Sequence, residues 1–282
     1  MSAEGPPSGP PLRGGSSFPR AVEGPFDPDR AELVALGDVG STNDEALERL
    51  RANGRPLWVT AERQLAGRGR RRRTWVSEPG NLYASWAWQS EYAPFPSDAH
   101  SRQTNVMGML PLAAAVALAD ALAELGLAPQ LKWPNDVLIA GEKVAGILIE
   151  TSVEAERAGG PGVRRTVIGF GVNIVHHPTD SPATALSHHR PDLDRESVFQ
   201  ALRQSVARVL TTVYRSDGIP LVRDRWLQRA VGIGYDVVVR YETDTITGRF
   251  LGLHDDGRLI LGHAEGTRLI AAGDVFLRTE RL

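Results

Sequence analysis

Residues 64–75 read Gln-Leu-Ala-Gly-Arg-Gly-Arg-Arg-Arg-Arg-Thr-Trp, and this stretch guides the interpretation of the whole chain. Five of its residues are arginines within six positions, Arg68 and Arg70–Arg73, and Gly67 and Gly69 lie beside them. Like charges at this density repel one another unless anions screen them, and glycine lets the backbone approach a ligand closely. Because the stretch offers its five cations no internal anions, it predicts a loop that is disordered without ligand and becomes ordered around a negatively charged one. A solvated basic loop, a targeting run and a patch for nucleic-acid phosphates remain alternatives.

The composition indicates that this charge is local. The 282 residues carry a net charge of −2 and are 41% hydrophobic, as expected of a soluble protein with one large domain or one domain plus a small one. The absence of cysteine excludes disulfides, thiolate catalysis and cysteine metal ligands. We find no apolar run of the roughly 18 residues that a membrane span needs and no signal-peptide pattern, so we expect a cytoplasmic protein without membrane contact.

Lysine is rare in this chain. Of 32 basic residues only two are lysines, Lys132 and Lys143. Arginine cannot replace lysine where a compact ammonium must enter a tight site. The scarcity indicates that both lysines are functional, although two lysines can also fall close together by chance.

The N-terminal region predicts a tail followed by a capped helix. Residues 1–30 are rich in Pro, Gly and Ser and predict a disordered tail. Thr42 and Glu45 form a capping-box pattern, which starts a helix that ends at Gly54. The polar run Ser41-Thr42-Asn43 has two interpretations, plain helix capping or polar groups at a helix N-terminus that face a ligand.

The remaining pattern predicts an α+β fold with a mainly antiparallel sheet and helices on one face. Residues 103–127 predict a mostly buried helix in which Pro111 lies near the first turn or causes a kink, and residues 194–214 predict an amphipathic helix. Five stretches predict strands of the main sheet: 33–36, 57–61, 81–88, 143–151 and 166–175.

Turns and a change of pattern define the domain boundaries. Pro134 excludes helix at the residue before it, and residues 140–142 predict a tight turn, so Lys132 and Lys143 flank one β-hairpin. Five short alternating runs after residue 231 predict a small antiparallel barrel. We therefore expect a larger domain at 31–230 and a C-terminal barrel at 231–282.

Four elements in this order and spacing resemble the biotin–protein ligases, or biotin–acetyl-CoA-carboxylase ligases. They are Ser41-Thr42-Asn43, the loop 64–75, Lys132-Trp133-Pro134-Asn135-Asp136 and Lys143-Val144-Ala145-Gly146-Ile147-Leu148. The resemblance covers about residues 33–282. It implies a catalytic fold related to class II aminoacyl-tRNA synthetases and an SH3-like C-terminal domain.

The resemblance also implies a two-step acyl transfer. The biotin carboxylate attacks the α-phosphate of ATP, giving biotinyl-5′-AMP and pyrophosphate, and a lysine of a carboxylase biotin carrier domain then displaces AMP. Family members use Mg²⁺. Cations must converge where a carboxylate meets a triphosphate. The expected partner is the carrier domain; a homodimer is left open.

The family motifs imply a role for each matching residue. The catalytic residues are Lys143, Arg70 and Lys132. The biotin site comprises Ser41, Thr42, Asn43, Gln64, Gly67, Arg68, Gly69, Arg70, Lys143 and Gly146. The nucleotide site comprises Arg70, Arg73, Trp75, Lys132, Asn135, Asp136 and Asn173. Gly146 and Gly171 would allow a ligand to approach closely, and Asp136 is the candidate Mg²⁺ ligand.

Two departures and two rival functions complete the prediction. Arg72 stands where the family loop commonly has glycine, which adds a charge and removes a flexible point. Residues 1–30 leave no room for the helix-turn-helix of some members, so we expect a ligase without DNA binding. A lipoate or other acyl-adenylate ligase and a nucleic-acid-binding module using Arg68–Arg73 are the rivals. The pairs His176-His177 and His188-His189 favour surface histidines over a metal site.

Overall fold

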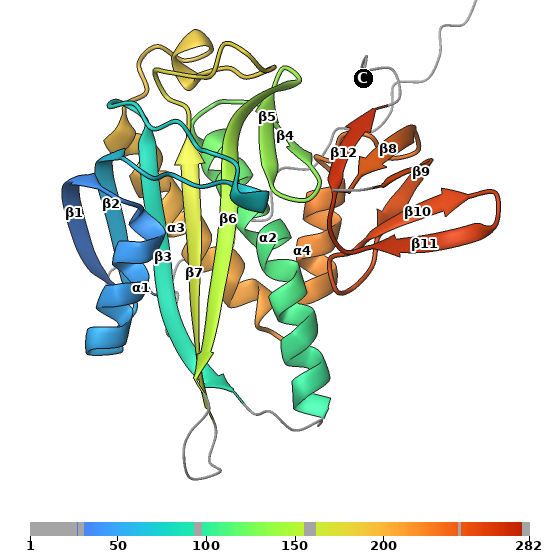
Figure 1. Cartoon of the computed structure of the whole chain (residues 1–282), viewed down its shortest axis with the longest axis horizontal. Coiled ribbons are helices and arrows are strands. Elements are labelled where there is room, and N and C mark those ends of the chain that lie inside the picture. The colour runs from blue at the N-terminus through green and yellow to red at the C-terminus, as the bar shows by residue number, and fades with distance from the viewer. Residues whose placement is uncertain (1–26, 28–30, 93–97, 155–161, 242–243, 278–282) are drawn as a thin grey trace, which may run out of the picture.

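The computed structural model describes residues 27, 31–92, 98–154, 162–241 and 244–277, and it contains two β-sheets with helices around them (Figure 1). The predicted tail lies, apart from Asp27, outside the described residues. The class predicted from the pattern, α+β, is confirmed by the two sheets and four α-helices of the described residues.

The larger sheet has seven strands in the order β1-β2-β3-β7-β6-β5-β4. Its first two strands are parallel because helix α1 connects them as a crossover, and all its other neighbours are antiparallel. The prediction of a mainly antiparallel sheet is therefore confirmed. The strands are β1 (Glu32–Val39), β2 (Leu57–Gln64), β3 (Leu82–Tyr92), β4 (Pro129–Lys132), β5 (Asp136–Ile139), β6 (Glu142–Glu154) and β7 (Gly162–Val172).

The helices cover both faces of this sheet, so the expectation of helices on one face is wrong for α1. Alternate residues of β2 point to opposite faces. Trp58 packs against Phe199 of α3 in an edge-to-face pair with ring centroids 5.4 Å apart, whereas Leu57 and Val59 pack against α1 in a separate small core. The helices are α1 (Thr42–Asn53), α2 (Asp98–Glu124), α3 (Arg195–Val213) and α4 (Gly218–Leu227).

Two details of the helices differ from the prediction. The N-cap of α1 is Ser41, whose hydroxyl accepts from the Asn43 amide, and Thr42 is the first helical residue, while Gly54 ends the helix in the left-handed conformation as expected. Helix α2 begins at Asp98, so Pro111 lies well inside it and not near its first turn. The segment Asn105–Glu124 of α2 is long and apolar enough to span a membrane, contrary to the expectation, but 78% of that window is buried within the fold, as in a core helix.

The smaller sheet contains the five strands predicted after residue 231. They are antiparallel neighbours in the order β11-β10-β9-β8-β12. The expected boundary between residues 230 and 231 falls between α4 and β8. The strands are β8 (Asp236–Arg240), β9 (Thr245–Leu253), β10 (Leu259–His263), β11 (Gly266–Ile270) and β12 (Asp274–Leu277).

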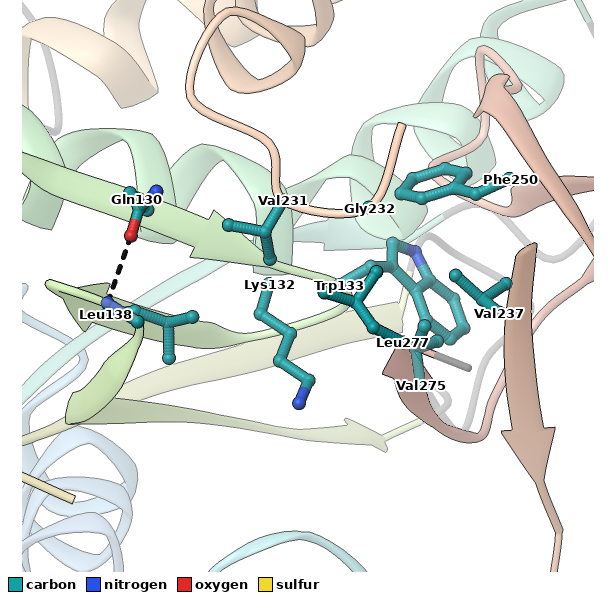
Figure 2. A pocket seen from close by; sticks show the side chains of 11 residues that line it. Gln130, Lys132, Trp133, Leu138, Val231, Gly232, Val237, Phe250, Val275 and Leu277 are labelled. Carbon is teal, nitrogen blue, oxygen red and sulfur yellow. Dashed lines mark hydrogen bonds between the residues drawn. The ribbon is translucent and has the colours of Figure 1, made fainter. Parts of the chain in front are cut away.

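The two sheets are in direct contact beside the hairpin of β4 and β5. The indole of Trp133 donates a hydrogen bond to the Gly257 carbonyl across 3.1 Å. A cavity of about 220 Å³ lies next to it, with Lys132 and Trp133 on one side and Val237, Val275 and other apolar side chains of the smaller sheet on the other (Figure 2). The smaller sheet is thus held against the end of the hairpin that carries Lys132.

Candidate functional site

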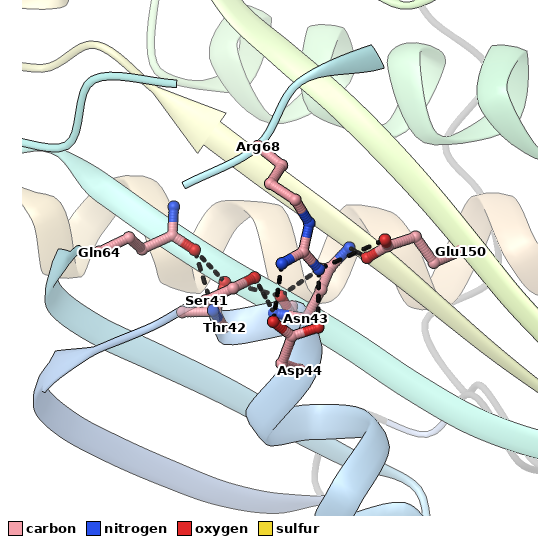
Figure 3. A network of polar contacts seen from close by, with 8 residues as sticks. Ser41, Thr42, Asn43, Asp44, Gln64, Arg68 and Glu150 are labelled. Carbon is pink, nitrogen blue, oxygen red and sulfur yellow. Dashed lines mark hydrogen bonds and ion pairs between the residues drawn. The ribbon is translucent and has the colours of Figure 1, made fainter. Parts of the chain in front are cut away.

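The N-terminus of α1 is surrounded by a network of polar side chains (Figure 3). Gln64, at the end of β2, accepts hydrogen bonds from the amide and the hydroxyl of Thr42 at 2.9 and 3.0 Å. The Ser85 hydroxyl lies 2.8 Å from Thr42 Oγ1 and 2.6 Å from Asn43 Oδ1. Ser41, Thr42 and Asn43 are each no more than 5% exposed. The sequence interpretation that these residues only cap the helix is therefore incomplete.

Arg68 crosses above this network and joins two distant elements. Its guanidinium donates two hydrogen bonds to Asp44 in the first turn of α1, at 2.6 and 2.8 Å, and lies 3.4 Å from Glu150 on β6. The second oxygen of Glu150 accepts from the Asn43 amide across 2.7 Å. The hydrogen bond from Arg68 lowers the pKa of Asp44 below its ordinary value, against an opposing effect of burial.

Sequence reasoning missed three members of this network: Asp44, Ser85 and Glu150. Asp44 follows the polar run directly and looks like an ordinary first-turn acid of a helix. Ser85 is a fully buried polar residue within the apolar strand β3. A serine in the middle of this apolar stretch was the sequence signal that could have identified it as a member of the network. Glu150 comes from β6, and only the pairing of β6 with β7 brings it across the sheet to α1.

The other arginines of the loop are held mainly by the smaller sheet. Asp274, at the start of β12, forms ion pairs with Arg71 at 3.5 Å and with Arg73. Arg71 also donates to the Arg240 carbonyl across 3.2 Å. The loop itself contains no acid, as the sequence shows, but Asp44, Glu150 and Asp274 face it from other elements and supply anions in the fold. Whether the loop changes order on ligand binding stays a prediction.

Arg70 lies between the two domains. Its guanidinium donates to the Asn135 side chain at 3.3 Å and to the Gly273 carbonyl at 3.4 Å. Burial lowers its pKa below the ordinary value, and the charge of Asp274 opposes that effect. A partly desolvated guanidinium of this kind gains more from an anionic ligand than a fully solvated one does.

The backbone of the loop folds back on itself as a short 3₁₀ turn at Arg70–Arg72. The Gly67 carbonyl accepts from the Trp75 amide, and the Gly69 amide donates to the Arg73 carbonyl at 2.7 Å. A side chain at Gly67 would lie 2.5 Å from the Trp75 carbonyl oxygen, so the turn requires glycine there. Arg72 has a φ of 57°, in the left-handed region that suits glycine, which is the residue that the family pattern commonly has at this position.

Lys143 faces Asp136 and Trp75. The three strands β4, β5 and β6 place Lys132 opposite Asp136, and Asp136 opposite Gly146. Lys143 Nζ lies 2.6 Å from Asp136 Oδ1 and 5.5 Å from the centre of the Trp75 ring system. The predicted grouping of both lysines at one hairpin is confirmed. The Lys143 ammonium, which was assigned to a substrate carboxylate, forms an ion pair with the Asp136 carboxylate in this structure.

The glycines predicted to face a ligand face Trp75 instead. A Cβ atom at Gly171 would lie 2.6 Å from the Trp75 ring, and one at Gly146 would lie 2.9 Å from it. The indole Nε1 of Trp75 is buried without a hydrogen-bond partner. The indole therefore packs over both glycines and carries an unused donor at the centre of the site.

The remaining predicted residues lie at the margins. Lys132 Nζ lies 5.3 Å from the ring of Phe276 in the smaller sheet. Asn173 is 3% exposed and donates its amide to the Thr184 carbonyl, so it supports the segment after β7. Within the described residues, no three His, Cys, Asp or Glu side chains form a potential metal cluster. His176, His188 and His189 are exposed, as predicted.

The arrangement divides into a neutral end and a cationic end. The neutral end, around Thr42, Asn43 and Gln64, offers hydroxyl and amide groups that both donate and accept. The cationic end gathers Arg70, Lys143 and other basic groups from both domains. Such a site suits an elongated substrate with a polar uncharged head and an acid tail that meets a polyanion.

Comparisons with known proteins match both the larger part of the chain and the segment that contains the smaller sheet. The model of the Biotin/lipoate A/B protein ligase family matches residues 38–173, and that of the Biotin protein ligase C terminal domain matches residues 232–278. Biotin–[acetyl-CoA-carboxylase] ligase from Paracoccus denitrificans is 34% identical over 252 residues, which cover 86% of this chain and 98% of that protein. The bifunctional ligase/repressor BirA from Bacillus subtilis is 34% identical over 85% of this chain and 72% of its own length.

A solved structure agrees with the sequence matches. Biotin protein ligase from Aquifex aeolicus in complex with biotin and ATP has a TM-score of 0.65 and 27% sequence identity, covering 88% of this chain and 98% of its own. Both sheets of this chain therefore have counterparts in proteins of one kind.

Proposed function

Since the chain belongs to the Biotin/lipoate A/B protein ligase family, we propose that it is an ATP-dependent biotin–[acetyl-CoA-carboxylase] ligase. The observation that supports this best is the neutral end of the site, where Thr42, Asn43, Gln64 and Ser85 form one hydrogen-bonded network. The reaction joins the carboxyl carbon of biotin to a lysine nitrogen of the carboxylase, with ATP giving AMP and pyrophosphate.

Biotin fits this network better than lipoate does. The ureido ring of biotin is neutral and has both donors and an acceptor, which hydroxyl and amide side chains can satisfy. The dithiolane ring of lipoate offers neither, so it could not pair with the polar groups of Thr42 and Asn43. A site whose side chains hydrogen-bond to polar groups of the substrate strongly rejects analogues that lack those groups.

The cationic end serves the first step. We propose that Lys143 leaves Asp136 and holds the biotin carboxylate, while Arg70 spans that carboxylate and the α-phosphate. One carboxylate oxygen then attacks the α-phosphorus, the bond to the β-phosphate oxygen breaks, and pyrophosphate leaves. Lys132 and Arg73 lie on the phosphate side, and Trp75 and Asn135 border the nucleotide. Asn173 is assigned a supporting position there.

The second step needs no nucleophile from the ligase. The ε-amine of the carrier lysine attacks the acyl carbon of biotinyl-5′-AMP, loses a proton and displaces AMP. Because the Arg68 side chain crosses above the neutral end, we propose that Arg68 and Gly69 border the biotin ring and hold the acyl adenylate until the carrier arrives.

The Mg²⁺ expected of this family fits a single carboxylate. Mg²⁺ retains several waters and is commonly held by one or two carboxylates plus substrate phosphates. Asp136, once Lys143 turns to biotin, is the carboxylate at the phosphate side that we assign to it. The ion would neutralise phosphate charge during transfer.

Several finer features stay our proposals. They are a class II aminoacyl-tRNA-synthetase-like catalytic domain at 31–230, an SH3-like barrel at 231–282, a cytoplasmic location, the biotin carrier domain as partner, a possible homodimer and the lack of DNA binding. The nucleic-acid alternative has less support than before, because Arg68, Arg71 and Arg73 are already paired with carboxylates.

Two assays test the proposal. ATP–pyrophosphate exchange measured with biotin, lipoate and octanoate should respond to biotin alone. Mass spectrometry of a carboxylase carrier domain, incubated with the protein, biotin and ATP, should show one added biotinyl group on a lysine. Exchange with lipoate only, or an unmodified carrier beside active exchange with another acid, would refute it.

A further inference from the structure

Glu150 contacts both the arginine loop and the polar network at α1. Its two carboxylate oxygens have different partners: one accepts from Asn43 at 2.7 Å, and the other lies 3.4 Å from Arg68 (Figure 3). Glu150 sits on β6, whereas Asn43 is on α1 and Arg68 is in the loop after β2. A single side chain therefore connects three elements that are far apart in the sequence.

The bond to Glu150 determines which way the Asn43 amide points. A carboxylate can only accept, so it requires the Nδ2 side of the amide. The Oδ1 side then faces the Ser85 hydroxyl at 2.6 Å. A Cβ atom at Gly169 would lie 2.4 Å from Asn43 Oδ1, so the glycine leaves room for the amide oxygen in this orientation. Without the carboxylate the amide could reverse, and the donors and acceptors at the neutral end would exchange places.

The same carboxylate helps to hold Arg68 over that end. Arg68 is bound bidentately by Asp44, and Glu150 adds a second anion 3.4 Å from the same Nη2 nitrogen that donates to Asp44. The side chains of Arg68 and Glu150 are 35% and 38% exposed, so the bridge lies at the mouth of the site, where solvent competes. Its value therefore comes from orientation more than from stability of the fold.

We propose that Glu150 is a positioning residue for biotin. Through one carboxylate oxygen it orients the Asn43 amide toward the ureido ring, and through the other it holds Arg68 over that ring. This inference rests on the proposed function. The contacts of Glu150 are with Asn43 and Arg68, and not with Asp136 or Lys132 on the proposed phosphate side, so its effect falls on the acid substrate and not on ATP.

Replacement of Glu150 separates the two contacts. Glu150→Gln retains an acceptor for Asn43 but loses the charge that faces Arg68, whereas Glu150→Ala loses both. In biotin-dependent ATP–pyrophosphate exchange we expect KM for biotin to rise about tenfold in the first variant and about a hundredfold in the second, as expected for the loss of one and two charged hydrogen bonds. KM for ATP and kcat should change less than threefold.

Glu154→Gln is the matched control. Glu154 lies on the same strand and pairs with Arg165 at 2.7 Å, away from the site. Its substitution should leave both KM values unchanged. Equal rises in the two KM values of Glu150→Ala, or an unchanged KM for biotin, would overturn the proposal.

A second measurement does not depend on ligase activity. Trypsin cleavage after Arg68, followed by mass spectrometry of the protein without ligands, should be faster in Glu150→Ala than in the wild type and in Glu154→Gln. If the wild type lacked biotin-dependent exchange, the proposed function would fail, and the trypsin measurement alone would test the Glu150–Arg68 contact. Equal cleavage rates in Glu150→Ala and the wild type would then overturn that contact, and faster cleavage in Glu150→Ala would support it.

Discussion

The functional role of Lys143 was indicated mainly by its being a lysine, and less by the residues around it. The chain uses lysine at two positions only, and the structure places both at the β4–β5–β6 hairpins. The contact with Asp136 was not predictable, because it depends on how β5 and β6 pair. The scarcity argument could identify the residue but not its partner.

Lys143→Arg should slow the formation of biotinyl-5′-AMP by about a hundredfold. The ammonium is confined between Asp136 and Trp75, and a Cβ at Gly146 would lie 3.5 Å from Lys143 Cε. A planar guanidinium on a longer arm would displace the reacting carboxylate, and a displacement of about 1 Å can reduce rates by that factor. Single-turnover measurement of adenylate formation checks this.

Arg63→Lys is the control for a charge-preserving exchange. Arg63 pairs with Asp38 on the surface, away from the site. Its substitution should leave the rate at the wild-type level. Rates for Lys143→Arg within threefold of the wild type would remove the argument from lysine scarcity.

The elements of the site were predicted more accurately than their contacts. Strands, turns and the helix start at α1 follow from apolar spacing and capping chemistry, and the structure has them within a few residues. The packing of α1 on the opposite face of the sheet was missed, because the pattern of one amphipathic helix does not reveal which face of the sheet it covers. The contact of Arg68 with Glu150 was missed because only the pairing of β6 with β7 brings Glu150 across the sheet.

Strand β7 contributes a position whose substitution tests the placement of Trp75. Gly171→Ala would put a methyl group 2.6 Å from the indole, which must then move away from Lys143. Overpacking of this kind commonly costs about 1–3 kcal/mol of folding stability, and displacement of the indole beside Lys143 should lower exchange rates by about tenfold. Gly37→Ala, on β1 with open space around it, should be neutral. Equal rates in the two variants would show that the indole position does not matter for adenylation.

At the scale of the whole molecule, the site depends on both domains. The smaller sheet was predicted as a separate unit, yet Asp274 and Gly273 hold three arginines of the loop. Sequence alone could not predict this, since the contacts join residues about 200 positions apart and depend on how the two sheets dock. The Asp274 carboxylate thus offsets part of the loop's positive charge from the smaller sheet.

Calorimetric titration of biotin into the purified protein, with and without a non-hydrolysable ATP analogue, tests the central claim most directly. That claim is that the polar network at α1 and the cations gathered beside it bind biotin for activation by a nucleotide. The account predicts a measurable binding heat for biotin, with affinity raised by the analogue because shared cations are drawn together. No heat of binding in either titration would contradict it.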